Sequence, residues 1–300
     1  MRRLSVVDAP SNLGLSPPAP GAVPGVYKLG WALREAGVAT RLHAADRGVV
    51  IPPRYESRKA EGTILNEVAL AGYSRKLADR VAPLVRSGEW TLVLGGDCSI
   101  LLGTMLALRR LGRYGLVFVD GHSDFRHPGN SATAGPVGAA AGEDLALVTG
   151  RGPPALIDLE GRAPLVRDED VVVVGPRPDD PCRDEVRGSR LQLIEAPEVR
   201  AAGAAATGRR VADGMGRRAV SGFWVHLDAD VVDPGLLPAV DAPAPGGLTF
   251  EELGGLLREL AASPLSVGLE VTVFDPDRDA EGRLAGRLAD TLVAALSTSR

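Results

Sequence analysis

Three short apolar runs in this chain each end in a polar motif, and this arrangement limits the folds open to it. Trp90–Leu94 leads into GlyGlyAspCysSer at residues 95–99 (motif 1), and Tyr114–Asp120 leads into AspGlyHisSerAsp at 120–124 (motif 2). Phe223–Asp228 leads into HisLeuAspAlaAspValValAspPro at 226–234 (motif 3). Short, fully apolar strands are typical of a parallel sheet that is covered on both faces. Because ligands bind beyond the carboxyl ends of such strands, we expect the three motifs to meet at one site.

The rest of the chain alternates between further apolar runs and helix-like segments. Strands are also predicted at Leu4–Val7, Val38–His43, Val171–Gly175 and Val267–Phe274. Helices are predicted at Tyr27–Ala36, Ile64–Leu84, Ile100–Leu111, Asp144–Thr149, Glu198–Met215, Phe250–Ala261 and Leu284–Leu296. This alternation predicts a three-layer α/β/α fold with a mostly parallel sheet of about seven to eight strands. We expect the chain to form a single domain over residues 1–300.

Composition limits the partners and the compartment of the protein. Hydrophobic residues make up 45% of the 300 residues, enough for a large core, and the formal net charge is −4. The arginines are scattered rather than clustered, so no nucleic-acid partner is expected. Two cysteines, Cys98 and Cys182, make no disulfide framework, which favours a reducing, cytoplasmic location. The first apolar run is too short for a signal peptide, and no run reaches the roughly 18 residues that span a membrane, so no membrane partner is expected.

Motifs 2 and 3 carry side chains that suit a metal site. Asp120, His122 and Asp124 alternate, and an extended backbone would point all three side chains the same way. Asp228 and Asp230 repeat this spacing further along the chain. Carboxylates and imidazoles suit Mg, Mn or Zn, and these ligands exceed what one catalytic ion needs. They therefore predict two ions that share bridging carboxylates and activate water.

Together the three motifs resemble those of the ureohydrolases, the family of arginase, agmatinase and formiminoglutamase. In that family they usually read GGDHS, DAHxD and DxDxxDP, and here they read GGDCS, DGHSD and DADVVDP. The resemblance extends from Gly14 to GlyLeuGluValThrValPheAspProAsp at residues 268–277. It implies a three-layer α/β/α fold, two bound ions, and hydrolysis of a guanidinium or related C–N bond by a metal-bridging hydroxide. Because ureohydrolases commonly form trimers or hexamers, it also implies a homo-oligomer.

Carried over position by position, the resemblance assigns six metal ligands. One ion would take Cys98, Asp120, Asp124 and Asp228, and the other would take His122, Asp120, Asp228 and Asp230. Asp120 and Asp228 would then be the bridges. Asp230 would also accept a hydrogen bond from the hydroxide and carry a proton towards the leaving amine. Asp233 is expected to be structural and to cap the turn before Pro234.

Motif 1 departs from the family at Cys98, which stands where a histidine is usual. Thiolate prefers softer ions such as Zn over Mn. Three interpretations stay open: Cys98 coordinates with an altered metal preference, it turns away as a small buried hydrophobe and leaves one ion weakly held, or the site holds a single ion. A cysteine here also resembles the hydroxyarginine-hydrolysing branch of the family.

The catalytic and substrate-binding positions differ as well. Ala141 falls where arginases carry a proton-relaying histidine, and His127 in the preceding loop is the candidate replacement. Val273 occupies the position of a guanidinium-binding glutamate. Glu270 matches a buried aspartate of the family and is expected to support catalysis from behind the metal ligands. Asn130 is a further candidate, as a substrate ligand in the loop after motif 2.

Two more aspartates are candidate substrate ligands. Asp180 matches an aspartate that binds the substrate amine in the family, although it also suits a simple turn before Pro181. Asp241 stands in AspAlaPro, where arginases usually read GlyThrPro.

These features predict a metal-dependent hydrolase that acts on a C–N bond of a guanidino, hydroxyguanidino, formimino or related small molecule. The expected cofactors are two divalent ions, with Mn the first choice and Zn the second. Two alternatives remain: a catalytically degenerate ureohydrolase homologue with a binding or structural role, and a mononuclear Zn amidohydrolase that resembles the deacetylases.

Overall fold

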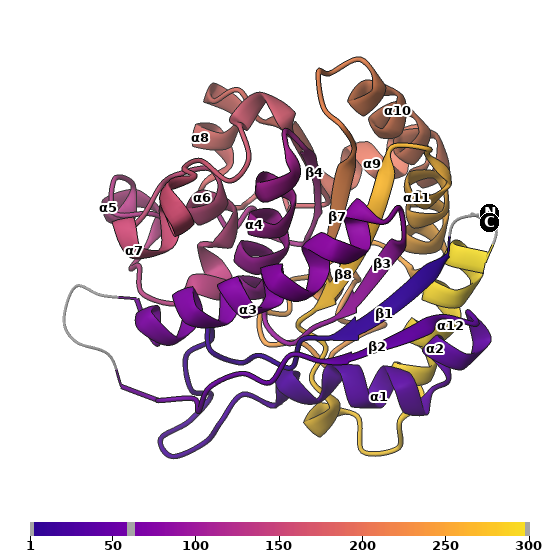
Figure 1. Cartoon of the computed structure of the whole chain (residues 1–300), viewed down its shortest axis with the longest axis horizontal. Coiled ribbons are helices and arrows are strands. Elements are labelled where there is room, and N and C mark those ends of the chain that lie inside the picture. Colours follow the sequence, from indigo (N-terminus) through magenta and orange to yellow (C-terminus); the bar gives the residue numbers. More distant parts are fainter. Residues whose placement is uncertain (1–2, 59–63, 298–300) are drawn as a thin grey trace.

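A single parallel sheet organises the molecule. The computed structural model describes residues 3–58 and 64–297, and over these residues eight parallel strands run in the order β2-β1-β3-β8-β7-β4-β5-β6 (Figure 1). The strands are β1 (Leu4–Asp8), β2 (Ala45–Val49), β3 (Trp90–Leu94), β4 (Gly115–Val119), β5 (Val171–Val174), β6 (Gln192–Ile194), β7 (Phe223–Asp228) and β8 (Ser266–Thr272). Helices cover both faces of this sheet, which confirms the predicted three-layer α/β/α fold.

The helices divide between the two faces. One face is covered by α1 (Leu29–Glu35), α2 (Val38–Arg41), α9 (Ala196–Ala202), α10 (Ala204–Gly216), α11 (Phe250–Ala262) and α12 (Arg283–Ser297). The other is covered by α3 (Glu67–Arg86), α4 (Leu101–Leu111), α5 (Ser131–Ala134), α6 (Asp144–Val148), α7 (Pro154–Ile157) and α8 (Arg183–Gly188). Motifs 1, 2 and 3 follow β3, β4 and β7, so all three lie at the carboxyl edge of the sheet.

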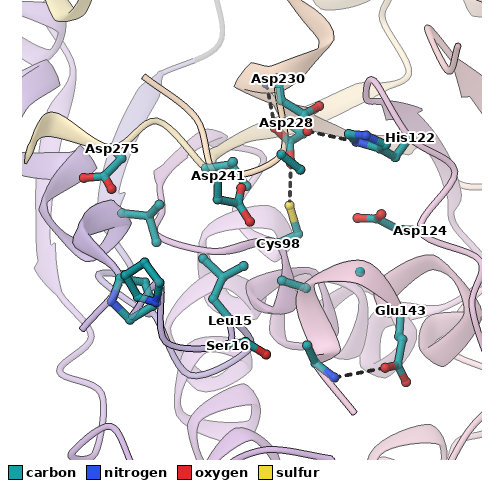
Figure 2. Close-up of a pocket in the computed structure, with 18 of the residues that line it drawn as sticks. Leu15, Ser16, Cys98, His122, Asp124, Glu143, Asp228, Asp230, Asp241 and Asp275 are labelled. Atoms are coloured by element: carbon teal, nitrogen blue, oxygen red, sulfur yellow. Dashed lines mark hydrogen bonds and ion pairs between the residues drawn. The ribbon is translucent and has the colours of Figure 1, made fainter. Parts of the chain in front are cut away.

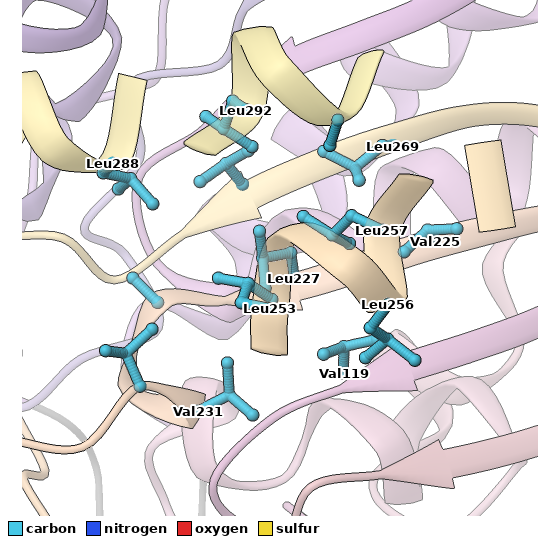
Figure 3. Packing of buried hydrophobic residues seen from close by; sticks show 14 of the residues in the cluster. Val119, Val225, Leu227, Val231, Leu253, Leu256, Leu257, Leu269, Leu288 and Leu292 are labelled. Carbon is cyan, nitrogen blue, oxygen red and sulfur yellow. The ribbon is translucent and has the colours of Figure 1, made fainter. Parts of the chain in front are cut away.

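Alternating strand residues supply the two hydrophobic cores. Val117 and Val119 of β4 face the α11 side, whereas Leu116 and Phe118 face the α4 side. Figure 3 shows the first core, where leucines of α11 and α12 pack over strand residues that include Val119, Val225, Leu227 and Leu269. Each fully buried side chain of this size stabilises the fold by about 1.5–3 kcal/mol, so the central strands form a rigid base for the motifs.

The predicted strand at Val38–His43 is wrong, because this segment forms helix α2 and a turn. Val38 and Leu42 are fully buried and four residues apart, a spacing that places both on one face of a helix. Gly37, with a φ of 82°, allows the turn between α1 and α2. The true strand, β2, lies at an edge of the sheet and is largely exposed, so it lacks the apolar pattern that marks the central strands.

The predicted helix at Glu198–Met215 is two helices, α9 and α10. Gly203 separates them with a φ of 81°, which ends the first helix. A capping box between Glu195 and Glu198 starts α9. The short strand β6 before it was not predicted, since only Ile194 of its three residues is buried.

Within residues 3–58 and 64–297, no helix is both long and apolar enough to cross a membrane.

Candidate metal centre

Motif 1 uses its polar residues to fix the turn that presents Cys98. The backbone at Gly96 lies so close to that of Ser11 that a Cβ would overlap it, which explains the glycine. The Asp97 carboxylate accepts hydrogen bonds from the Ser99 amide (2.9 Å) and the Ser11 hydroxyl (2.8 Å). Asp97 is therefore occupied with the turn, and Cys98 faces the centre of the site (Figure 2).

Motif 2 gathers its side chains by an irregular loop rather than by the extended backbone that we expected. β4 ends at Val119, and Asp120 accepts a hydrogen bond from the His122 amide at 2.6 Å, which bends the chain. Asp124 has a φ of 42°, in the left-handed region that aspartate tolerates better than most residues. This bend changes the backbone, yet the donor atoms of Asp120, His122 and Asp124 still fall within the same cluster of candidate ligands.

Motif 3 connects to motif 2 through Asp230. The Asp228 carboxylate accepts a hydrogen bond from the Asp230 amide at 2.7 Å, a bend like the one in motif 2. Asp230 then accepts the Gly121 amide at 3.0 Å and lies 2.9 Å from Nδ1 of His122. These contacts fix the position of motif 3 against motif 2 at the carboxyl edge of the sheet.

The six predicted ligands form one continuous cluster. One ligand atom each of Cys98, Asp120 and Asp124 lie within 4.8 Å of one another, and so do those of Asp120, His122 and Asp230. The Cys98 thiol donates to Oδ2 of Asp228 at 2.8 Å (Figure 2). Buried Oδ2 of Asp120 has no hydrogen-bond partner among the residues that the structure describes.

Burial and mutual repulsion raise the pKa of most acids in this cluster. The pKa values of Asp120 and Asp228 rise well above their usual range, first because both are buried and then because other aspartates surround them. For Asp124, burial is again the largest cause and the pKa rises to about 8. Burial also raises the pKa of the Cys98 thiol, with a further contribution from Asp228. So much buried acid calls for a compensating cation.

His122 supplies positive charge to this cluster. Burial alone would lower its pKa, but the hydrogen bond and charge of Asp230, with Asp124, outweigh burial and raise the pKa to about 9. The pairing in turn lowers the pKa of Asp230, against the effect of burial. The cluster offers carboxylate oxygens, one imidazole and one thiol, and among the described residues its buried Oδ2 of Asp120 has no hydrogen-bond partner. This donor set fits divalent ions such as Mn and Zn.

A pocket of about 410 Å3 opens above the cluster, a size typical of small-molecule sites. Ala141 and Val273, at the two positions where the resemblance implies other residues, both line it. Asp241 also lines the pocket, and its side chain is open to it. The pKa of Asp241 nevertheless rises to about 6, first because the surrounding walls partly desolvate the carboxyl group and then because the charge of Asp230 repels it. Arg126 and Arg278, which the sequence analysis did not single out, add positive charge to the wall.

Three other predicted residues are engaged in contacts of their own. His127 lies 2.8 Å from Glu185, and Asn130 donates to the same carboxylate at 2.7 Å and to the Phe125 carbonyl at 2.9 Å. Asp180 accepts hydrogen bonds from the amide and hydroxyl of Ser123 at 2.8 and 2.7 Å. Among the described residues, the pocket lining includes none of His127, Asn130 and Asp180.

Glu270 lies beneath the pocket, fully buried in the sheet. Its Oε1 is 2.8 Å from Nδ1 of His226, its register partner on β7. Asp144, at the start of α6, approaches the same histidine. Sequence reasoning missed Asp144 and gave His226 no role. The available signal was a histidine at an inward-facing position of an otherwise apolar strand.

Comparison with known proteins agrees with the motifs. Residues 24–298 match the model of the Arginase family. The arginase of Bacillus caldovelox is 29% identical over 294 residues, which cover 95% of both chains. The arginase of Bacillus subtilis (strain 168) is 28% identical, over 98% of this chain and 97% of the relative. The chain therefore belongs to the arginase family, whose members hydrolyse C–N bonds of non-peptide linear amidines.

Solved structures give the same result. The native structure of Bacillus caldovelox arginase superposes with a TM-score of 0.87 and 29% identity, covering 99% of this chain and 98% of that one. Formimidoylglutamase from Bacillus subtilis superposes with a TM-score of 0.74 over 99% of this chain and 87% of that one. At 17% identity, that second likeness concerns the fold alone.

Proposed function

We propose that this chain is a metal-dependent hydrolase that cleaves a guanidino-type C–N bond in a small molecule that also carries an anionic group. The observation that carries the proposal is the cluster of six donor side chains, five of which line a pocket of ligand size. Membership of the arginase family supports the bond type. The location at the carboxyl edge of a parallel sheet supports the site.

In this proposal the motifs hold two divalent ions. Cys98, Asp120, Asp124 and Asp228 would hold one, and His122, Asp120, Asp228 and Asp230 the other. When bound, such ions polarise the atom under attack and lower the pKa of water, with Mn suited to the carboxylates and Zn to the thiol.

The protein's own groups then handle the proton. Oδ2 of Asp230, beside Nδ1 of His122, can accept a proton from water and pass it to the leaving nitrogen. The amide of Gly121 donates to the other oxygen of Asp230 and fixes its orientation.

The pocket wall supports a substrate with charges at both ends. The acidic floor attracts the cationic guanidino-type group, and Asp241 adds a carboxylate beside it. Arg126 and Arg278 line the same pocket and suit a carboxylate at the far end of the substrate. Val273 is apolar where the resemblance implies a guanidinium-binding glutamate, so we infer a substrate modified from plain arginine, such as a hydroxyguanidine.

The test is an activity screen of protein loaded with Mn or Zn. Arginine, hydroxyarginine, agmatine, formiminoglutamate and an acetylated amine would be compared by release of urea, hydroxyurea, ammonia, formamide or acetate. We expect a carboxylate-bearing guanidine to be favoured over agmatine, which lacks the carboxylate.

Asp228→Asn should reduce kcat/KM by about a hundredfold or more, because even residues behind metal ligands contribute 10–100-fold. The matched control is Asp275→Asn, which alters an acid at the pocket wall outside the ligand cluster and should retain metal. Wild-type protein that binds divalent ions but hydrolyses no amidine in the panel would refute the proposal. Activity on the acetylated amine alone would instead indicate an amidohydrolase.

A further inference from the structure

A second group of polar side chains lies behind Cys98, deeper than the pocket. Asp144, His226 and Glu270 are all fully buried, with 0% of each exposed. His226 and Glu270 are register partners on the central strands β7 and β8, where the neighbouring residues are apolar. Ionisable side chains in the middle of a sheet destabilise a fold unless they are paired or bind an ion.

The contacts of His226 orient its ring. Nδ1 lies 2.8 Å from Oε1 of Glu270, and in this hydrogen bond the ring nitrogen donates to the carboxylate oxygen. The ring also stacks on Phe118, with 4.6 Å between ring centres. Nε2 is then left with a lone pair that is directed away from Glu270. A carboxylate that binds the second ring nitrogen in this way is typical of metal-bound histidines.

Nε2 of His226 meets two further donor atoms. It lies 3.9 Å from Oδ2 of Asp144, and one ligand atom each of Cys98, Asp144 and His226 lie within 4.8 Å of one another. Oδ1 of Asp144 accepts the Leu145 amide, which leaves Oδ2 available. Among the described residues, neither Oδ2 of Asp144 nor Nε2 of His226 has a hydrogen-bond partner. Each such buried atom destabilises the fold unless it finds a partner.

We propose that Cys98, Asp144 and His226 form an inner metal site for a thiophilic divalent ion of the zinc type. Sulfur, nitrogen and oxygen donors suit zinc, whose bond lengths of about 2.0–2.3 Å place tetrahedral ligands about 3.5 Å apart. Small shifts of the three side chains from their present separations achieve this. Glu270 is the positioning residue that holds the His226 ring.

This proposal goes beyond the amidine hydrolysis proposed above, since Asp144 and His226 belong to neither ion of the outer cluster. It also accounts for the soft ligand in motif 1. Cys98 lies within reach of both sets of donors, Asp120 and Asp124 of the outer cluster and Asp144 with His226. Where the inner ion is bound, the thiolate serves it in place of the outer ion assigned to it above, and that outer ion keeps Asp120, Asp124 and Asp228.

The first experiment uses unaltered protein, so it does not depend on variants that fold. Crystals would be equilibrated with zinc chloride, and anomalous difference maps would be calculated from data collected above and below the zinc absorption edge. We expect a peak bounded by Sγ of Cys98, Oδ2 of Asp144 and Nε2 of His226. Peaks at the outer cluster with none at this position would overturn the proposal.

A second experiment follows cobalt binding by the thiolate-to-cobalt charge-transfer band, which reports on Cys98 without reference to activity. His226→Asn and Asp144→Asn should each raise the dissociation constant for cobalt, measured from this band, at least about tenfold. Glu270→Gln should raise it by about 10–100-fold. The matched control for Asp144→Asn is Asp124→Asn, which alters an acid of the outer ion that would otherwise take Cys98 and should retain the band. A band that persists in both inner variants but disappears in the control would assign the thiol to the outer cluster and refute the inner site.

The two proposals fail separately. An inner zinc peak in protein without amidine hydrolysis would refute only the proposed function. Amidine hydrolysis by protein without the inner peak would refute only the inner site.

Discussion

Val273 adopts a backbone conformation that β-branched residues rarely take, with a φ of 71°. A left-handed conformation costs an ordinary residue about 1–2 kcal/mol. The Val273 amide donates to the Gly96 carbonyl at 2.8 Å, so the strained residue ties the end of β8 to motif 1. Strain of this kind tends to occur at functional sites. The strained Val273 contributes its side chain to the lining of the pocket.

Replacing Val273 with glutamate is the first prediction at the residue scale. Val273→Glu removes the β-branch and adds a carboxylate to the pocket, which should lower KM for unmodified guanidines such as arginine. A hydrogen bond to a charged group contributes about 1.5–3 kcal/mol, equivalent to about 10- to 100-fold in affinity. Steady-state kinetics on metal-saturated protein would measure the change in KM for arginine.

Val273→Gln is the matched control, because it has nearly the same shape without the charge. Equal effects of the two substitutions would show that shape rather than charge governs guanidine binding, contrary to the prediction.

The site residues that sequence predicts most directly are those that follow a buried strand. Cys98, Asp120 and Asp228 gather because the strand before each is fully apolar and its end is fixed by the sheet. Asp144 could not be found this way, since it begins the short helix α6 and reaches Cys98 only through tertiary packing. The contacts of His127 with Glu185 likewise depend on loop geometry that the sequence does not reveal.

Between β7 and α11, the Asp233 carboxylate anchors both ends of the loop at residues 235–247. Asp233 accepts the Gly235 amide at 2.9 Å, the Gly246 amide at 2.8 Å and the Gly247 amide at 3.2 Å. These hydrogen bonds lower the pKa of Asp233. The loop carries Asp241 into the pocket, so Asp233 fixes a pocket wall from outside the ligand cluster.

At the element scale, Asp233→Ala should destabilise the protein by about 0.5–1.5 kcal/mol, since it removes hydrogen bonds to loop amides that water replaces only in part. Urea denaturation would measure the free energy of unfolding. Asp279→Ala is the comparison, because the Asp279 carboxylate likewise accepts a backbone amide, at the start of α12. Because the folded-state pKa of Asp233 lies below its unfolded value, its contribution is present above about pH 4 and disappears as the pH falls through the lowered pKa. A difference between wild type and Asp233→Ala that grows on acidification would contradict this assignment.

The central elements of the fold were predictable and the peripheral ones were not. β3 and β7 match their predicted bounds because both faces of each strand are buried, which requires an apolar run. β2 and β6 lie at the two edges of the sheet, where exposed polar residues remove that pattern. The break at Gly203 within the predicted helix depends on one residue with positive φ, which periodicity alone does not detect.

On the scale of the whole molecule, the fold concentrates acid at one edge of the sheet. The net charge of the chain is only −4, yet Asp120, Asp124, Asp228 and Asp230 converge within motifs 2 and 3. The single imidazolium of His122 offsets only part of this charge. The parallel sheet fixes the ends of its strands, so the protein cannot relieve the repulsion by moving the motifs apart. Divalent ions would therefore stabilise the whole fold, in addition to any part in catalysis.

Removing metal should consequently lower the melting temperature of the protein. An ion present at about 100 times its dissociation constant stabilises the folded state by about 2.7 kcal/mol, so two ions contribute about 5 kcal/mol. At about 2 °C per kcal/mol for a chain of this size, we expect chelation to lower Tm by about 10 °C and added Mn or Zn to restore it. Scanning calorimetry would measure the shift, and Asp228→Asn should show a much smaller one because its cluster binds metal weakly. An unchanged Tm in chelator and in excess metal would mean that the acid cluster holds no ion, and the proposed two-ion chemistry would fail with it.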